Sequence, residues 1–110
     1  MLSGIYSVKF NSSSDSGLGI AVFDNGKVHG ADFSYIYKGR YNLDEKTIRA
    51  EIFISQYQDI QDSVFGPLNN FTLVLIGYDS YDSFELTGYV DGQPLLSISI
   101  VGKKLSELAT

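Results

Sequence analysis

Hydrophobic and polar residues alternate along most of the chain. Residues 48–54 place isoleucine or alanine at every second position, and residues 6–10 and 96–100 repeat the same period of two. Because successive side chains of a β-strand point to opposite faces, this pattern predicts strands with one buried and one solvated face. Strands of this kind are typical of antiparallel sheets.

Turn residues separate these segments at short intervals. Asn25-Gly26 and Asp91-Gly92 are pairs that accept the backbone angles of tight hairpin turns. The longest connection, residues 58–69, contains Gly66-Pro67, and we expect it to hold one short helical turn. Eight strands are predicted, over residues 4–10, 17–23, 27–33, 35–42, 47–57, 70–78, 83–90 and 94–102.

Eight consecutive strands with short connections predict an all-β, up-and-down antiparallel arrangement. An open sheet would leave two unpaired edge strands, whereas closure into a barrel removes both edges. Eight is also a number of strands that closes readily. We therefore expect a single domain, residues 1–110, folded as an eight-stranded barrel, with a β-sandwich as the alternative.

Composition and charge exclude several classes of function. Thirteen acidic and eight basic residues give a net charge of −5, and the basic residues are scattered apart from Lys103-Lys104. Direct nucleic-acid binding is therefore not expected, because it requires clustered lysine and arginine. Cysteine is absent, which excludes thiol and disulfide chemistry. We expect neither a signal peptide nor a membrane-spanning segment, and hence a cytoplasmic protein.

The polar residues predict no catalytic, metal or cofactor site. His29 is the only histidine, so a histidine-rich metal site is excluded, and a Ser-His-Asp triad would require it beside a serine nucleophile. Asp79 and Asp82 flank a short loop without the regular ligand spacing of a calcium site. A hydrolase that uses paired carboxylates stays open as a third, disfavoured alternative. We expect no enzymatic activity and no cofactor.

Three tyrosines share one face of a predicted strand. Tyr35, Tyr37 and Tyr41 follow the period of two, with Gly39 between them. They can line a ligand pocket inside a barrel. The favoured interpretation is that they pack as core and cross-strand contacts, with each hydroxyl at the rim.

Short glycine-rich and aromatic patterns follow one another in a characteristic order. They are Gly4–Phe10, Gly19–Val22, Asn25–Val28, Gly30–Asp32, Tyr35–Tyr37, Gly39, Tyr41 and Ser63–Gly66. This order resembles the GrlR-like family, named for the repressor subunit that restrains the master activator of a bacterial type III secretion gene island. The resemblance runs over nearly the whole chain and is clearest from Gly4 to Gly39.

The resemblance implies a lipocalin-like eight-stranded barrel that forms a homodimer and acts by protein contact. The family's namesake binds a helix-turn-helix activator and keeps it off its promoter, and a surface Glu-Asp-Glu-Asp stretch is implicated in that role. The matching loop here is Leu43-Asp44-Glu45-Lys46, in which Lys46 reverses the charge of one position. The resemblance thus implies that Asp44 and Glu45 contact the partner.

The family's Gly-Gly-Asp pattern reads Gly30-Ala31-Asp32 in this chain. Glycine tolerates the bend where one barrel strand passes into the next. An aspartate beside that bend can accept hydrogen bonds from the backbone N–H groups that the bend frees. We therefore predict structural roles for Gly30, Asp32 and Gly39.

Two functions follow from these observations. The leading hypothesis is a non-enzymatic negative regulator of type III secretion-like genes that sequesters a transcriptional activator. The alternative is a carrier of a small apolar ligand inside the barrel, because eight strands leave room for either filling side chains or one small ligand.

Overall fold

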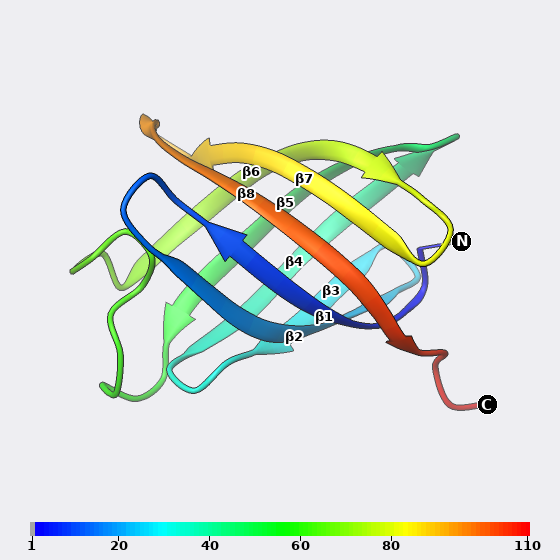
Figure 1. The fold of residues 1–110 in the computed structure, drawn as a ribbon, viewed down its shortest axis with the longest axis horizontal. Coiled ribbons are helices and arrows are strands. Elements are labelled where there is room, and N and C mark those ends of the chain that lie inside the picture. The colour runs from blue at the N-terminus through cyan, green and yellow to red at the C-terminus, as the bar shows by residue number, and fades with distance from the viewer. Residues whose placement is uncertain (1) are drawn as a thin grey trace.

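The computed structural model describes residues 2–110 and forms a closed barrel of antiparallel strands (Figure 1). Each strand pairs with the next one along the chain, and the first also pairs with the last, which closes the sheet. The strands are β1 (Gly4–Asn11), β2 (Ser16–Asp24), β3 (Lys27–Ala31), β4 (Tyr35–Asp44), β5 (Thr47–Gln56), β6 (Asn70–Asp79), β7 (Ser83–Val90) and β8 (Gln93–Ser106). The predicted eight-stranded up-and-down barrel is confirmed, and the sandwich alternative is wrong.

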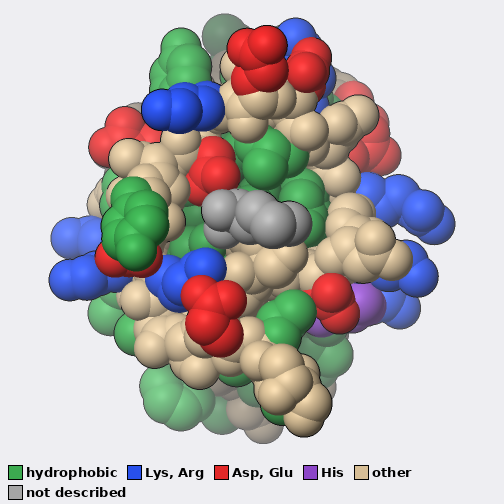
Figure 2. All heavy atoms as spheres, turned by 90° about the vertical axis from the view of Figure 1, so that its right-hand side faces the viewer, with side chains coloured by type: hydrophobic (Ala, Val, Ile, Leu, Met, Phe, Trp, Pro, Cys, Tyr) green, Lys and Arg blue, Asp and Glu red, His purple; other side chains and the backbone are tan. Residues whose placement is uncertain are grey.

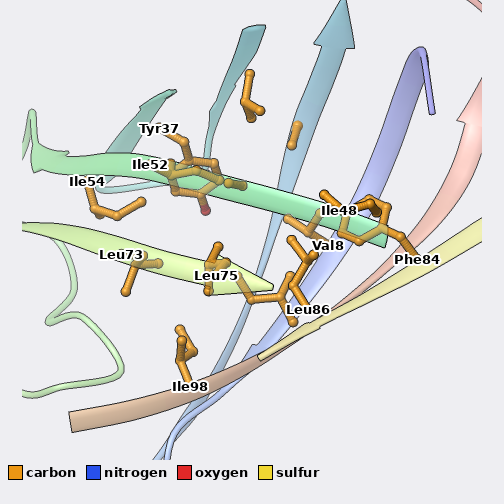
Figure 3. Close-up of a cluster of buried hydrophobic side chains, with 14 of the residues drawn as sticks. Val8, Tyr37, Ile48, Ile52, Ile54, Leu73, Leu75, Phe84, Leu86 and Ile98 are labelled. Carbon is orange, nitrogen blue, oxygen red and sulfur yellow. The ribbon is translucent and has the colours of Figure 1, made fainter. Parts of the chain in front are cut away.

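Alternation along each strand separates the core from the surface. In β5 the side chains of Ile48, Ala50, Ile52 and Ile54 are buried, whereas the residues between them face solvent. Figure 3 shows such side chains from several strands converging on the barrel interior. Full burial of one isoleucine or leucine side chain contributes about 1.5–3 kcal/mol, so the inward face of the sheet supplies most of the stabilisation.

The two ends of the barrel are built differently. At one end Tyr6, Phe23 and Phe84 are almost fully buried, and their ring centroids lie 5.0–5.5 Å apart. We call this the closed end; it carries the β2–β3, β4–β5 and β6–β7 turns (Figure 1). We call the opposite end the mouth, which carries residues 12–15, 32–34, 57–69 and 91–92.

The long connection between β5 and β6 corrects one expectation. The part of the chain that the structure describes holds turns and an isolated bridge between Ser63 and Gly66 here, and no helical turn. The Ser63 hydroxyl donates to the Leu68 carbonyl at 2.8 Å and accepts from the Phe65 N–H at 3.1 Å. It thus occupies backbone groups that a helix would use, and Gly66 then turns the chain with a φ of 76°. The side chains of Val64, Phe65 and Leu68 pack against the core, so the connection covers part of the mouth.

Several strand ends also differ from the prediction, most of them by one or two residues, and two of the differences have a clear cause. β3 ends at Ala31 instead of residue 33, because the chain bends at Asp32. β8 continues to Ser106 instead of residue 102, because its last residues pair with the start of β1, as far as Ile5 opposite Ser106. Residues 2–110 include no helix with the length and apolar character needed to cross a membrane.

Candidate functional site

The Asp32 carboxylate is the centre of a hydrogen-bond network at the mouth. One carboxylate oxygen accepts from the backbone N–H groups of Ser34 and Tyr35, both at 2.8 Å. The other accepts from the Tyr37 hydroxyl at 2.6 Å, and the Asp32 carbonyl accepts from the Tyr57 hydroxyl at 2.6 Å. Asp32 therefore ties the β3–β4 bend to the inner face of β4 and to the start of the β5–β6 connection.

The Tyr37 hydroxyl acts in this network as a donor. Burial raises the pKa of Tyr37 far above its usual value, and the hydrogen bond to the Asp32 carboxylate raises it further. The phenol therefore stays protonated throughout the physiological range. A neutral phenol that donates to a charged carboxylate is a strong, charge-assisted contact.

The structure places the three candidate tyrosines on the inner face of β4. Tyr35 and Tyr37 are buried, and the Tyr35 hydroxyl donates to the side-chain oxygen of Asn69 at 3.1 Å. Tyr41 is half-buried and packs against Phe23, with ring centroids 5.2 Å apart, towards the closed end. Tyr35 and Tyr37 therefore line the interior near the mouth, and Tyr41 does not.

A cavity of about 520 Å³ runs from the mouth into the barrel. Phe23 and Phe84 form its floor, and Val64 from the β5–β6 connection borders it near the mouth. Ala21 contributes a small side chain to the wall, where the facing strands contribute leucine and isoleucine. The volume lies within the range of about 300–1,000 Å³ that small-molecule pockets occupy.

Gly30 and Gly39 lie within strands, not at the bend. A methyl group added to Gly30 would collide with the carbonyl oxygen of Ile20, and one added to Gly39 would collide with that of Glu51. Neither glycine has a positive φ. The structure thus relates both glycines to the close approach of neighbouring strands, whereas the bend itself is formed around Asp32.

Asp44 and Glu45 lie at the closed end, away from the cavity mouth (Figure 1). Asp44 ends β4, and Glu45-Lys46 form the two-residue turn to β5, with all three side chains exposed. Glu45 has a φ of 57°, in the left-handed region that normally favours glycine or asparagine. Among residues 2–110 the only ion pair joins Lys104 and Glu107, so the two acids project into solvent without a paired base.

A comparison with protein-family models matches residues 1–108 to the family described as T3SS negative regulator, GrlR. The chain belongs to the GrlR family. The match spans almost the whole barrel, so the resemblance read from the short sequence patterns is confirmed, and the family is one of negative regulators of type III secretion. A search of curated proteins finds no match for this GrlR-family chain.

His29 takes no part in the network around Asp32. It is exposed on β3 of this GrlR-family barrel, between Val22 of β2 and Lys38 of β4. In residues 2–110 no group of three or more histidine, cysteine, aspartate or glutamate side chains lies close enough to hold a metal ion.

Sequence reasoning missed two acids at the cavity rim. Asp15 in the β1–β2 connection and Asp62 in the β5–β6 connection both border the cavity beside Asp32. They are far apart in the sequence and come to the same cavity only in the folded barrel. The feature of the sequence that could have pointed to these rim acids is that the segments around them contain aspartate and no basic residue.

Proposed function

We propose that this GrlR-family protein is a non-enzymatic negative regulator that acts in the cytoplasm by protein contact, holding a helix-turn-helix activator away from its promoter. Membership of a family of type III secretion negative regulators carries the proposal. The chain's acidic character adds to it, because a negatively charged protein can compete with DNA phosphates for the basic surface of an activator.

The β4–β5 turn supports a place for that contact. Asp44 and Glu45 are exposed at its tip, where charges accelerate encounter with a basic surface. Glu45 occupies the left-handed region, whereas the β2–β3 turn at the same end places Asn25 and Gly26 in positive φ, as tight hairpins prefer. Glycine or asparagine would be less strained at this position, so the presence of a glutamate supports a role for Glu45 beyond turn formation.

A binding measurement with loop variants tests this site. Asp44→Ala with Glu45→Ala should weaken capture of a candidate helix-turn-helix activator encoded nearby and flatten its salt dependence, since rim charges govern association rate. Lys46→Glu should strengthen capture, because it extends the acidic stretch. Asp24→Ala, at the neighbouring β2–β3 turn, is the matched control and should bind like the parent. Binding of all variants like the parent, at two salt concentrations, would place recognition elsewhere.

The outer barrel surface supports assembly as a homodimer. Ile20, Ile36 and Phe53 point outward from β2, β4 and β5 and retain 44%, 39% and 47% exposure. The strand register places Ala31 between Ile20 and Ile36, so the apolar strip is continuous across β3. Phe53 lies diagonal to Ile36 and pairs directly with Lys38, so the strip reaches β5 beside one basic side chain. Contiguous exposed apolar surface of this kind marks interaction sites, and a second copy of the barrel presents a matching strip.

The cavity supports a second function, the binding of a small apolar ligand. Its wall is mostly apolar, it opens at the mouth, and it is large enough for a small molecule. The mouth and the Asp44-Glu45 turn lie at opposite ends of the barrel. The two functions therefore use separate surfaces and do not exclude one another.

A further inference from the structure

The connections at the mouth of the barrel are acidic and contain no basic residue. Four connections build this end, residues 12–15, 32–34, 57–69 and 91–92, and none contains lysine, arginine or histidine. Together they contain five aspartates, Asp15, Asp32, Asp59, Asp62 and Asp91. The nearest basic residues in the strands are Lys9, which pairs with Leu18, and Lys38, which pairs with Phe53. The closed end differs, because basic and acidic side chains occur there side by side (Figure 2).

Three of these acids border the cavity itself. The Asp32 carboxylate already accepts the hydrogen bonds of the bend, whereas Asp15 and Asp62 are exposed at the rim. The head group of an amphiphile whose apolar part fills the cavity would lie among these carboxylates. Charges interact more strongly beside a low-dielectric wall than in bulk water, so a negatively charged head group would be repelled there.

Lys9 is the one basic residue at the boundary of the cavity. Its side chain is exposed on the outer face of β1, since the preceding Val8 is buried on the inner face. Successive side chains of a strand point to opposite faces, so Lys9 does not neutralise the rim from inside.

Ser34 adds a second, independent observation. Ser34 borders the cavity, and its hydroxyl is buried and has no hydrogen-bond partner among residues 2–110. A buried hydroxyl without a partner is costly, and it can both donate and accept a hydrogen bond. A polar group of a bound molecule would satisfy it once the serine side chain turns toward the cavity, because the hydroxyl has almost no accessible surface as it lies.

We propose that the cavity binds an uncharged or positively charged amphiphile and discriminates against anionic ones such as fatty acids. The apolar body lies against Phe84 and Val64, and the head group lies near Ser34, Asp15 and Asp62. This inference rests on the second proposed function and names the chemical class of its ligand.

Three amphiphiles with one chain and different head groups test the proposal. Dodecylamine, dodecanol and dodecanoate are titrated at neutral pH, below their aggregation limits, against the protein loaded with the neutral fluorescent probe N-phenyl-1-naphthylamine. The amine and the alcohol should displace the probe with one site per barrel. Dodecanoate should bind at least about tenfold more weakly than either of them. Equal or tighter binding of dodecanoate would overturn the charge selectivity and leave ligand binding intact. If none of the three amphiphiles binds, either in probe displacement or in direct calorimetric titration, both the charge selectivity and the ligand-binding function are overturned.

Rim variants assign the selectivity to residues. Asp15→Asn combined with Asp62→Asn should bring dodecanoate to within about threefold of dodecanol. Asp91→Asn, an acid at the same end that does not border the cavity, and Lys9→Gln should leave the ranking of head groups unchanged. Ser34→Ala should weaken the alcohol and the amine several-fold without lowering stability. Unchanged selectivity in the double variant, or a changed ranking in Lys9→Gln, would contradict the assignment.

Discussion

At the scale of single residues, Asp32 is the position whose local hydrogen bonds have the largest consequence for the fold. Its carboxylate satisfies two backbone N–H groups and one buried hydroxyl in a bend that no regular ladder serves. Hydrogen bonds to a charged group contribute more than neutral ones, and removal leaves several donors unpaired at once. These contacts support the predicted structural role of Asp32.

Substitution of Asp32 tests that role. Asp32→Ala should lower the free energy of unfolding by about 1–3 kcal/mol, because buried donors lose their acceptor. Asp32→Asn keeps one oxygen for the two backbone N–H groups and should lose less than half as much. Urea denaturation measures both, with exposed Asp91→Ala as control. Unchanged stability of Asp32→Ala together with a specific loss of partner binding would show that Asp32 acts in recognition.

Tyr37 makes the same network sensitive to high pH. The pKa of its hydroxyl is raised in the folded protein above the unfolded value of 10.0, first by burial and then by Asp32. The stability that this provides is fully present below pH 10.0 and decreases as the pH rises above it. Tyr37→Phe cannot ionise, so between pH 8 and about 10.5 its urea midpoint should fall less than that of the parent. A parallel fall in both proteins would show that Tyr37 is not part of the alkaline transition.

At the scale of elements, alternation with period two predicted all eight strands, because each has one buried and one exposed face. The errors occurred where side chains replace backbone partners. Asp32 ends β3 early and Ser63 organises the β5–β6 connection without a helix, and neither effect depends on hydrophobic pattern. The extension of β8 depends on pairing with β1, which lies at the other end of the sequence.

The β4–β5 turn yields an element-level prediction. Glu45 adopts the left-handed conformation, which costs about 1–2 kcal/mol for any residue with a Cβ. Glycine avoids this cost, but it loses part of the gain because its unfolded chain has more conformational freedom. Glu45→Gly should therefore raise the free energy of unfolding by about 0.5–1 kcal/mol. Gly26→Ala in the β2–β3 turn, at a φ of 81°, should have the opposite effect. Destabilisation by Glu45→Gly would mean that the glutamate side chain supports the fold.

At the scale of the whole molecule, the closure of the sheet and the presence of a cavity were the features hardest to predict from the sequence. Sandwich and barrel need the same alternation, and only the pairing of β1 with β8 separates them. The cavity depends on the sum of inward side-chain volumes, for example Ala21 opposite larger residues, and on how the β5–β6 connection covers the mouth. Tyr35 and Tyr37 are buried and also border the cavity, so burial alone does not separate the core and pocket interpretations of these residues.

Assembly is also a property of the whole molecule. If the strip of Ile20, Ile36 and Phe53 joins two barrels, light scattering at micromolar concentration should give a dimer mass. Phe53→Glu should then produce monomers, because a charge would be buried in an apolar interface. Val101→Glu is the control, since Val101 is similarly exposed, at 45%, on β8, the strand farthest around the barrel from β4. A parent protein that is monomeric at high concentration, or a Phe53→Glu variant that remains dimeric, would refute this interface.

The most direct test of negative regulation by contact follows an activator on its own promoter. Fluorescence anisotropy of labelled promoter DNA is measured with a candidate helix-turn-helix activator while the GrlR-family protein is added. We predict that near-stoichiometric amounts release the activator, that the protein alone leaves the anisotropy of the DNA unchanged, and that Asp44→Ala with Glu45→Ala shifts release to higher concentration. Anisotropy that stays constant although the two proteins form a complex, or that rises with the GrlR-family protein alone, would contradict the account.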